Sequence, residues 1–191
     1  MAARPATPAM RAAIIAIALL LAAACAQAQE RDLVRVQRST VRFTSEAPLE
    51  TITATTTEAK GILDRSERSF AVQIPVVAFE GFNAPLQREH FQENYMVSRQ
   101  WPMATFTGRV IEAVDLRAPG SQAVRAKGEL TIRGTTKERI IPCTLDVVDN
   151  GVRVRSSFEV PVADHGIRIP RVVQQKVSAV VRVEVDLFFA P

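Results

Sequence analysis

The sequence predicts an all-β protein: an antiparallel sandwich or barrel of about eight strands with one short helical insert closing one end. Apolar and polar residues alternate along most of the chain, which is typical of half-buried strands. Short turns separate these strands, and no β-α-β rhythm is present. A barrel is favoured over a sandwich, because a closed sheet leaves no edge strand exposed on an exported monomer.

The first 28 residues are typical of an export signal. Arg4 and Arg11 are followed by the apolar run 12–24, which is shorter than the roughly 20 residues that a membrane-spanning helix needs. A small-x-small cleavage site then predicts a mature chain that begins at Gln29. We therefore expect a secreted, periplasmic protein with one domain over residues 29–191.

A lipoprotein signal is the alternative for this segment, with Cys25 as the lipidated residue. Such signals usually carry Leu three positions before the cysteine, and this chain has Ala22 there, with Leu21 one position too early. Cleavage at the small-x-small site is therefore the favoured interpretation.

The charge balance argues against a nucleic-acid partner. The chain has 24 basic and 20 acidic residues, scattered without a basic run or stripe of the kind that phosphate binding needs. We expect no nucleic-acid binding.

Each expected strand is a stretch of alternating or β-favouring residues bounded by Gly, Pro, Asn or Asp. Asn150-Gly151 is the strongest turn motif, because these residues suit the positive φ of a tight hairpin. A second hairpin turn is expected over 134–137. The expected strands are 34–46, 49–56, 62–64, 68–77, 105–116, 123–133, 138–148, 152–162 and 177–189.

Residues 83–106 are expected to form the helical insert. Asn83 can cap the helix, and Pro85 suits its first turn, where a missing N–H costs nothing. Leu86 and Tyr95 would lie about 180° apart on one regular helix. We therefore expect one or two short helical turns with an irregular joint, which plug an end of the barrel or cover a sheet edge.

The sequence offers little catalytic chemistry. His90 and His165 are far apart and have no partner at metal-ligand spacing, so we interpret them as surface or capping residues and expect no metal and no cofactor. Cys143 has no base nearby in the sequence and is interpreted as a small buried residue. We expect no enzymatic activity; a hydrolase or redox-accessory enzyme is the alternative, and would depend on one of the two histidines.

Phenylalanine is the main aromatic residue, and several aromatic residues lie in or beside the insert. From the pattern alone, these residues either pack a filled core or line an apolar cavity. A cavity with few polar groups is typical of apolar ligand sites. A filled barrel would make the protein a periplasmic interaction or structural module.

The order and spacing of several short motifs across nearly the whole mature chain resemble the YceI-like family. The motifs are Ser39-x-Val41-x-Phe43; Lys60-Gly61-Ile62-Leu63-Asp64; Arg88-x-His90-Phe91 with Tyr95-Met96; Trp101-Pro102-x-Ala104-Thr105-Phe106-x-Gly108; Gly128-x-Leu130-Thr131-Ile132-Arg133-Gly134-x-Thr136-Lys137; and Phe158-x-Val160 with Asp164-x-Gly166-Ile167-x-Ile169-Pro170.

This resemblance implies an exported protein with a lipocalin-like eight-stranded barrel that binds a polyisoprenoid or other lipid for transport, storage or sequestration. It implies no catalytic residue. The chain departs from the family in Gln37-Arg38-Ser39, where a Trp and Asp-x-x-His-Ser are common, and in Trp101, where Tyr is usual. Transient contact with a membrane or a periplasmic or membrane partner, and the oligomeric state, stay open.

Seven aromatic residues are predicted to form the wall or lid of the cavity and to contact the ligand. Tyr95 and Trp101 can also hydrogen-bond a headgroup at the mouth. The seven are Phe43, Phe70, Phe91, Tyr95, Trp101, Phe106 and Phe158.

Overall fold

The structure is a computed structural model that describes residues 31–191, so the export signal expected over residues 1–28, Cys25 included, lies outside the described part. Residues Asp32–Pro191 form one compact unit. Its strands are β1 (Leu33–Glu46), β2 (Thr51–Thr56), β3 (Lys60–Asp64), β4 (Ser69–Pro75), β5 (Met103–Val110), β6 (Gly120–Ile132), β7 (Thr135–Val148), β8 (Gly151–Pro161) and β9 (Val180–Ala190).

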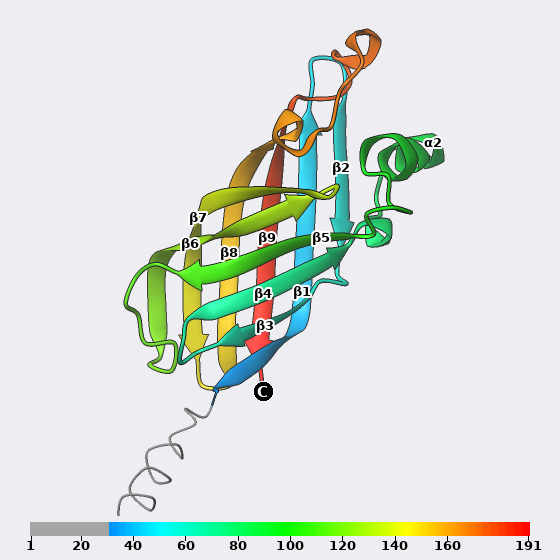
Figure 1. Cartoon of the computed structure of the whole chain (residues 1–191). Coiled ribbons are helices and arrows are strands. Elements are labelled where there is room, and N and C mark those ends of the chain that lie inside the picture. Colours follow the sequence, from blue (N-terminus) through cyan, green and yellow to red (C-terminus); the bar gives the residue numbers. More distant parts are fainter. Residues whose placement is uncertain (1–30) are drawn as a thin grey trace, which may run out of the picture. The chain divides into compact units, whose positions relative to one another are not determined.

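The strands close into an antiparallel barrel, which confirms the predicted fold class (Figure 1). β1 pairs with β9 along one side, and the remaining strands follow in sequence order from β3 to β9. The other side of β1 is shared, since its first residues pair with β3 and its last with β2. β2 and β3 therefore occupy one position between them, and the closed barrel has eight strands.

The break between β2 and β3 is held by a side chain of β1. The Ser39 hydroxyl donates to the carbonyl of Thr57 at 2.7 Å and accepts from the amide of Ala59 at 3.2 Å. These bonds satisfy backbone groups that lack strand partners, as buried polar groups require. The chain can therefore leave β1 after β2 and return to it as β3.

The alternation of the sequence places the apolar residues inside. On β1, Val34 and Val41 are buried while Arg35 and Arg42 face solvent. Successive side chains of a strand point to opposite faces of the sheet, so one face of every strand lines the interior.

The insert between β4 and β5 has the predicted helical turns and the irregular joint. A short α-helix, α2 (Pro85–His90), continues directly into a π-helical turn, η2 (Phe91–Tyr95). The expected cap is wrong: Ala84 is the N-cap, and no side chain caps this helix. Asn83 instead donates its side-chain amide to the carbonyl of Thr51 at 3.0 Å, which ties the insert to β2.

Three short 3-10 segments were not expected from the sequence. η1 (Val76–Ala78) precedes the insert, while η3 (Val162–His165) and η4 (Arg171–Val173) lie in the long connection between β8 and β9. A single helical turn has no periodic pattern long enough to be detected.

Two expected boundaries are corrected. The strand predicted over 105–116 ends at Val110, and a loop carries the chain to β6. The turn predicted over 134–137 is shorter, because only Arg133 and Gly134 separate β6 from β7. Both residues have positive φ, 48° and 69° respectively, which suits the twist of a two-residue hairpin.

The Asn150-Gly151 hairpin is correctly placed, but for a different reason. Gly151 pairs with Val148, so the two-residue loop is Asp149-Asn150, and neither Asn150 nor Gly151 has a positive φ. A Cβ at Gly151 would lie 2.2 Å from the carbonyl oxygen of Phe189. Glycine is therefore needed at this position for the close approach of β9.

None of the helices among residues 31–191 has the length and apolar character required to traverse a bilayer.

Candidate ligand-binding cavity

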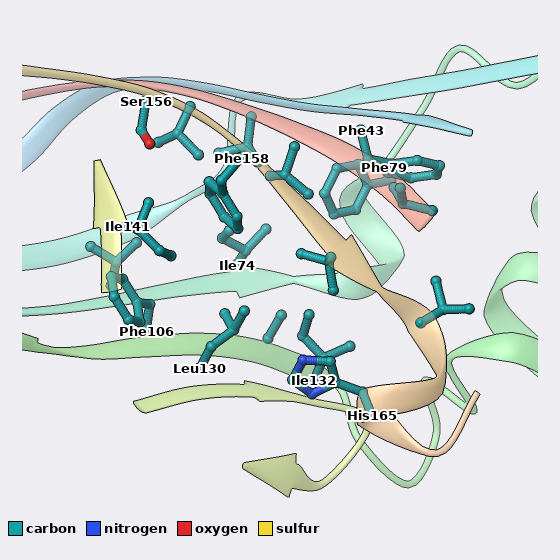
Figure 2. A pocket seen from close by; sticks show the side chains of 18 of the residues that line it. Phe43, Ile74, Phe79, Phe106, Leu130, Ile132, Ile141, Ser156, Phe158 and His165 are labelled. Atoms are coloured by element: carbon teal, nitrogen blue, oxygen red, sulfur yellow. The ribbon is translucent and has the colours of Figure 1, made fainter. Parts of the chain in front are cut away.

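The barrel encloses a cavity of about 490 Å³. This volume is within the range of about 300–1,000 Å³ that is usual for small-molecule sites. Its wall is mainly aliphatic and aromatic, and every barrel strand from β3 to β9 contributes to it, together with β1 and β2. Figure 2 shows part of this wall, with Phe106, Phe158, Ile74, Ile141 and Leu130 pointing into the interior.

An aromatic cluster joins the barrel wall to the insert. Phe43 of β1 contacts three rings from the insert and the segment before it, with centroid distances of 5.3 Å to Phe79, 5.9 Å to Phe82 and 5.1 Å to Phe91. Phe91 and Phe82 are also in contact, at 5.2 Å. The insert is thus fixed over the side of the barrel beside β2 (Figure 1).

The mouth of the cavity lies at the end of the barrel where the long connections meet. The turn after β1, the insert and the β8–β9 connection all carry cavity-lining residues, including Glu50, Gln87 and Lys176. The amide of Leu49 donates to the carbonyl of Gln175 at 2.8 Å, and Gln87 donates to Glu50 at 2.5 Å. Polar side chains are therefore concentrated at this end.

A second apolar cluster joins the insert to the β8–β9 connection. Met96 from the insert and Ile167 from the connection are buried with Val76, and Tyr95 and Ile132 pack against them. The two long connections therefore support each other at the mouth.

The opposite end of the barrel is occupied by Leu116. This residue lies on the loop between β5 and β6, is 1% exposed and belongs to the cavity lining. The other connections at this end, 65–68 and 149–150, are short turns. The cavity is therefore a tube with Leu116 at its inner end.

Six of the seven predicted site residues line the cavity. Phe70 and Phe106 pack against each other in the wall, with ring centroids 5.1 Å apart. Their contact with a ligand stays a prediction. The six are Phe43, Phe70, Phe91, Tyr95, Phe106 and Phe158.

Trp101 is placed elsewhere and is not part of the cavity lining. Its ring lies under the guanidinium of Arg133, with the Arg133 Cζ 5.6 Å from the ring centroid, and against Gly134. Arg133 also donates to the carbonyl of Gly166. Trp101 therefore supports the turn between β6 and β7 and, through Arg133, the connection that follows β8.

The interpretation of His165 as a surface or capping residue is wrong. Its side chain is 1% exposed and lines the cavity, and its Nδ1 lies 2.9 Å from the carbonyl oxygen of Thr135. The Asp164-His165-Gly166 sequence correctly indicated a turn, but Thr135 is 30 positions away and no local pattern could reveal this contact. His90 is exposed, and lies at the mouth.

Two ionisable groups in the wall are held in their neutral forms. Burial raises the pKa of the Cys143 thiol and raises the pKa of the Tyr95 hydroxyl, because removal from water disfavours the charged form. Cys143 also donates to the carbonyl of Ile141. The wall at these positions therefore suits an uncharged, apolar molecule.

We found no candidate metal-binding cluster in the part of the chain that the structure describes. No group of three or more His, Cys, Asp or Glu side chains is close enough there to hold an ion.

A closed antiparallel barrel with an apolar interior is the architecture of barrels that hold one small ligand. The YceI-like domain family matches residues 34–189, and the chain therefore belongs to this family. The match covers all nine strands except the first residue of β1 and the last residue of β9.

Solved structures share this fold at low sequence identity. A polyisoprenoid binding domain from Saccharophagus degradans, described as implicated in plant cell wall breakdown, superposes with a TM-score of 0.72 at 13% identity, covering 85% of this chain and 100% of that chain. BcnA of Burkholderia cenocepacia gives a TM-score of 0.66 at 15% identity, covering 80% and 96%. A YceI protein of Campylobacter jejuni gives 0.58 at 12%, covering 72% and 84%. No curated protein sequence matches the chain.

Proposed function

We propose that this protein binds a long apolar molecule, a polyisoprenoid or another lipid, inside its barrel. The observation that carries the proposal is the cavity of about 490 Å³ with its aliphatic and aromatic wall. Each buried methylene of a ligand contributes about 0.8 kcal/mol, so a long chain is held tightly with few hydrogen bonds. The description of the Saccharophagus degradans domain as polyisoprenoid binding supports the same ligand class.

We further propose that the protein is exported and acts as a carrier without catalytic activity. The sequence of the first 28 residues supports release into the periplasm, where a long apolar chain is insoluble unless it is enclosed. Transport, storage and sequestration all need this enclosure and no chemical step.

Transient contact of the mouth with a membrane is part of the proposal. Leu49, Leu86 and Val172 belong to three connections at the mouth end and are 67%, 57% and 91% exposed, respectively. Side chains of this kind can enter the surface of a bilayer while a lipid passes into the tube. Co-sedimentation with vesicles tests it: triple substitution of these residues by Ser should abolish vesicle binding and leave binding of a detergent-dispersed isoprenoid intact.

Native mass spectrometry of protein purified from the host periplasm, followed by solvent extraction, tests the ligand. A discrete added mass that extracts as an isoprenoid or another lipid is the expected result. A ligand-free mass together with failure to rebind purified isoprenoids and phospholipids would contradict the proposal and favour an interaction module with no ligand.

A further inference from the structure

One buried polar atom in the cavity wall has no hydrogen-bond partner among the described residues. His165 is the last residue of η3, and the left-handed conformation of Gly166, with φ 70°, turns the chain directly after it. The imidazole is buried at 1% exposure and belongs to the cavity lining. Figure 2 shows the ring pointing into the pocket beside Ile132 and Leu130. Its Nε2 makes no hydrogen bond to any of the described residues.

The other ring nitrogen determines what Nε2 can do. Nδ1 lies 2.9 Å from the carbonyl oxygen of Thr135, and a carbonyl oxygen only accepts hydrogen bonds, so Nδ1 carries the hydrogen. In a neutral imidazole only one nitrogen is protonated, and Nε2 is then an acceptor. The contact with Thr135 thus fixes both the orientation of the ring and its tautomer.

Two polar side chains further along the wall already have hydrogen-bond partners. The hydroxyl of Ser156 donates to the carbonyl of Pro142 at 2.7 Å, and the thiol of Cys143 donates to the carbonyl of Ile141. The side chains labelled next to His165 in Figure 2, Leu130 and Ile132, are aliphatic. A buried acceptor without a partner is unfavourable, so a donor from a ligand has a place here.

We propose that Nε2 of His165 accepts a hydrogen bond from a hydroxyl group at the end of the bound chain. The cavity then selects a free alcohol over an ether or hydrocarbon of the same length. Because His165 lies on the β8–β9 connection at the mouth, the hydroxyl end rests there and the tail extends toward Leu116. This inference rests on the proposed function, and specifies the ligand's polar end.

The wild-type protein alone provides the first test. Its affinities for geranylgeraniol and for geranylgeranyl methyl ether are compared at about pH 8, where imidazole is ordinarily neutral. The two probes share the apolar chain, but only the alcohol has a hydrogen to donate. We expect the alcohol to bind about five- to tenfold more tightly, the effect of one hydrogen bond. Equal affinities would overturn the inference and leave the carrier function intact, whereas failure of both probes to bind would contradict the carrier function itself.

A matched pair of variants provides the second test. His165→Phe keeps an aromatic ring and removes the acceptor, so the preference for the alcohol should disappear while the ether binds as before. His90 also lines the cavity, at its mouth, so His90→Phe tests whether this second imidazole is the acceptor instead; loss of the preference in this variant would overturn the assignment to His165. A preference that persists in a folded His165→Phe protein would overturn the inference.

Nitrogen NMR of the wild-type chain gives a measurement that does not depend on folding of a variant. The chain contains two histidines, so the imidazole signals are easily assigned. We expect the Nδ1-protonated tautomer at His165 and a shift of its Nε2 resonance with geranylgeraniol but not with the ether. An Nε2-protonated tautomer, or the same response to both probes, would overturn the inference.

Discussion

The ring of Phe91 stacks on the ring of Phe43 across the junction between the insert and the barrel, with centroids 5.1 Å apart and planes 20° from parallel. Among the described residues, the one isolated backbone bridge near this junction joins Thr55 to Glu80, which precedes the insert. The aromatic contacts, together with the Asn83 side chain, therefore position the insert.

Phe91→Ala should loosen the insert while the barrel stays folded. The substitution removes the ring that contacts Phe43, Phe79 and Phe82, and should lower the free energy of unfolding by about 2 kcal/mol, since this side chain is only half buried. Hydrogen exchange should become faster at amides of residues 83–101 and stay unchanged in β6 and β7. Leu86→Ala, at an exposed position of α2, is the control and should change stability by less than about 0.5 kcal/mol.

Phe106→Asp should reduce ligand uptake at least about tenfold, because it places a carboxylate in an apolar wall beside Phe70. Phe188→Asp is the matched control: Phe188 lies on β9 between two lining residues, so it faces outward, where its ring contacts the guanidinium of Arg38. Binding of a fluorescent isoprenoid analogue measures the effect, with circular dichroism to check folding. Normal uptake by a folded Phe106→Asp protein would contradict the assignment of this wall.

Gly134→Ala should destabilise the protein more than Gly166→Ala. Both glycines have nearly the same positive φ, 69° and 70°, so the backbone strain of an alanine is matched. A Cβ at Gly134 would lie 2.1 Å from Nε1 of Trp101, whereas at Gly166 the nearest atom is 3.8 Å away. We expect an additional loss of about 1–3 kcal/mol for Gly134→Ala in urea unfolding. The difference should shrink in a Trp101→Ala background; an unchanged difference would show that Trp101 is not its cause.

Asp32 should make stability depend on pH at the acid end. The hydrogen bond from Arg65, and then that from Arg117, lower the pKa of the Asp32 carboxyl in the folded protein, more than burial raises it. A carboxyl whose folded pKa is depressed stabilises the fold above its unfolded pKa of about 3.9, and this contribution is lost as the pH falls through the folded pKa.

Asp32→Asn should therefore lower stability at neutral pH and flatten the decline below about pH 4, as measured by thermal unfolding across that range. Asp149→Asn, at an exposed turn residue without a salt bridge to the described residues, is the control and should retain the wild-type slope. A wild-type slope in Asp32→Asn would mean that this pair of arginines does not stabilise the carboxylate.

The strands were predictable because their pattern is local. Val34 and Val41 are buried and the arginines that follow them are exposed, as alternation requires, and the insert has the irregular joint that the positions of Leu86 and Tyr95 imply. Helix capping was not predictable in the same way, because the Asn83 side chain hydrogen-bonds to the carbonyl of Thr51, a residue 32 positions away.

The sequence could predict which residue types line the candidate site, but not the positions that depend on long-range contacts. Side chains of a strand alternate between the interior and the solvent, and large apolar residues favour the interior. Most of the predicted wall residues therefore line the cavity. Trp101 and His165 were misplaced because their positions depend on long-range contacts. Trp101 packs on a turn more than 30 positions later, and His165 is oriented by the first residue of β7.

The position of Leu116 has a consequence for how the proposed ligand would enter and leave the cavity. Because Leu116 occupies the inner end of the tube, a bound ligand would enter and leave at the mouth. For the proposed carrier function, a single opening implies that the protein would meet the donor and the acceptor of the ligand one after the other, and not at the same time.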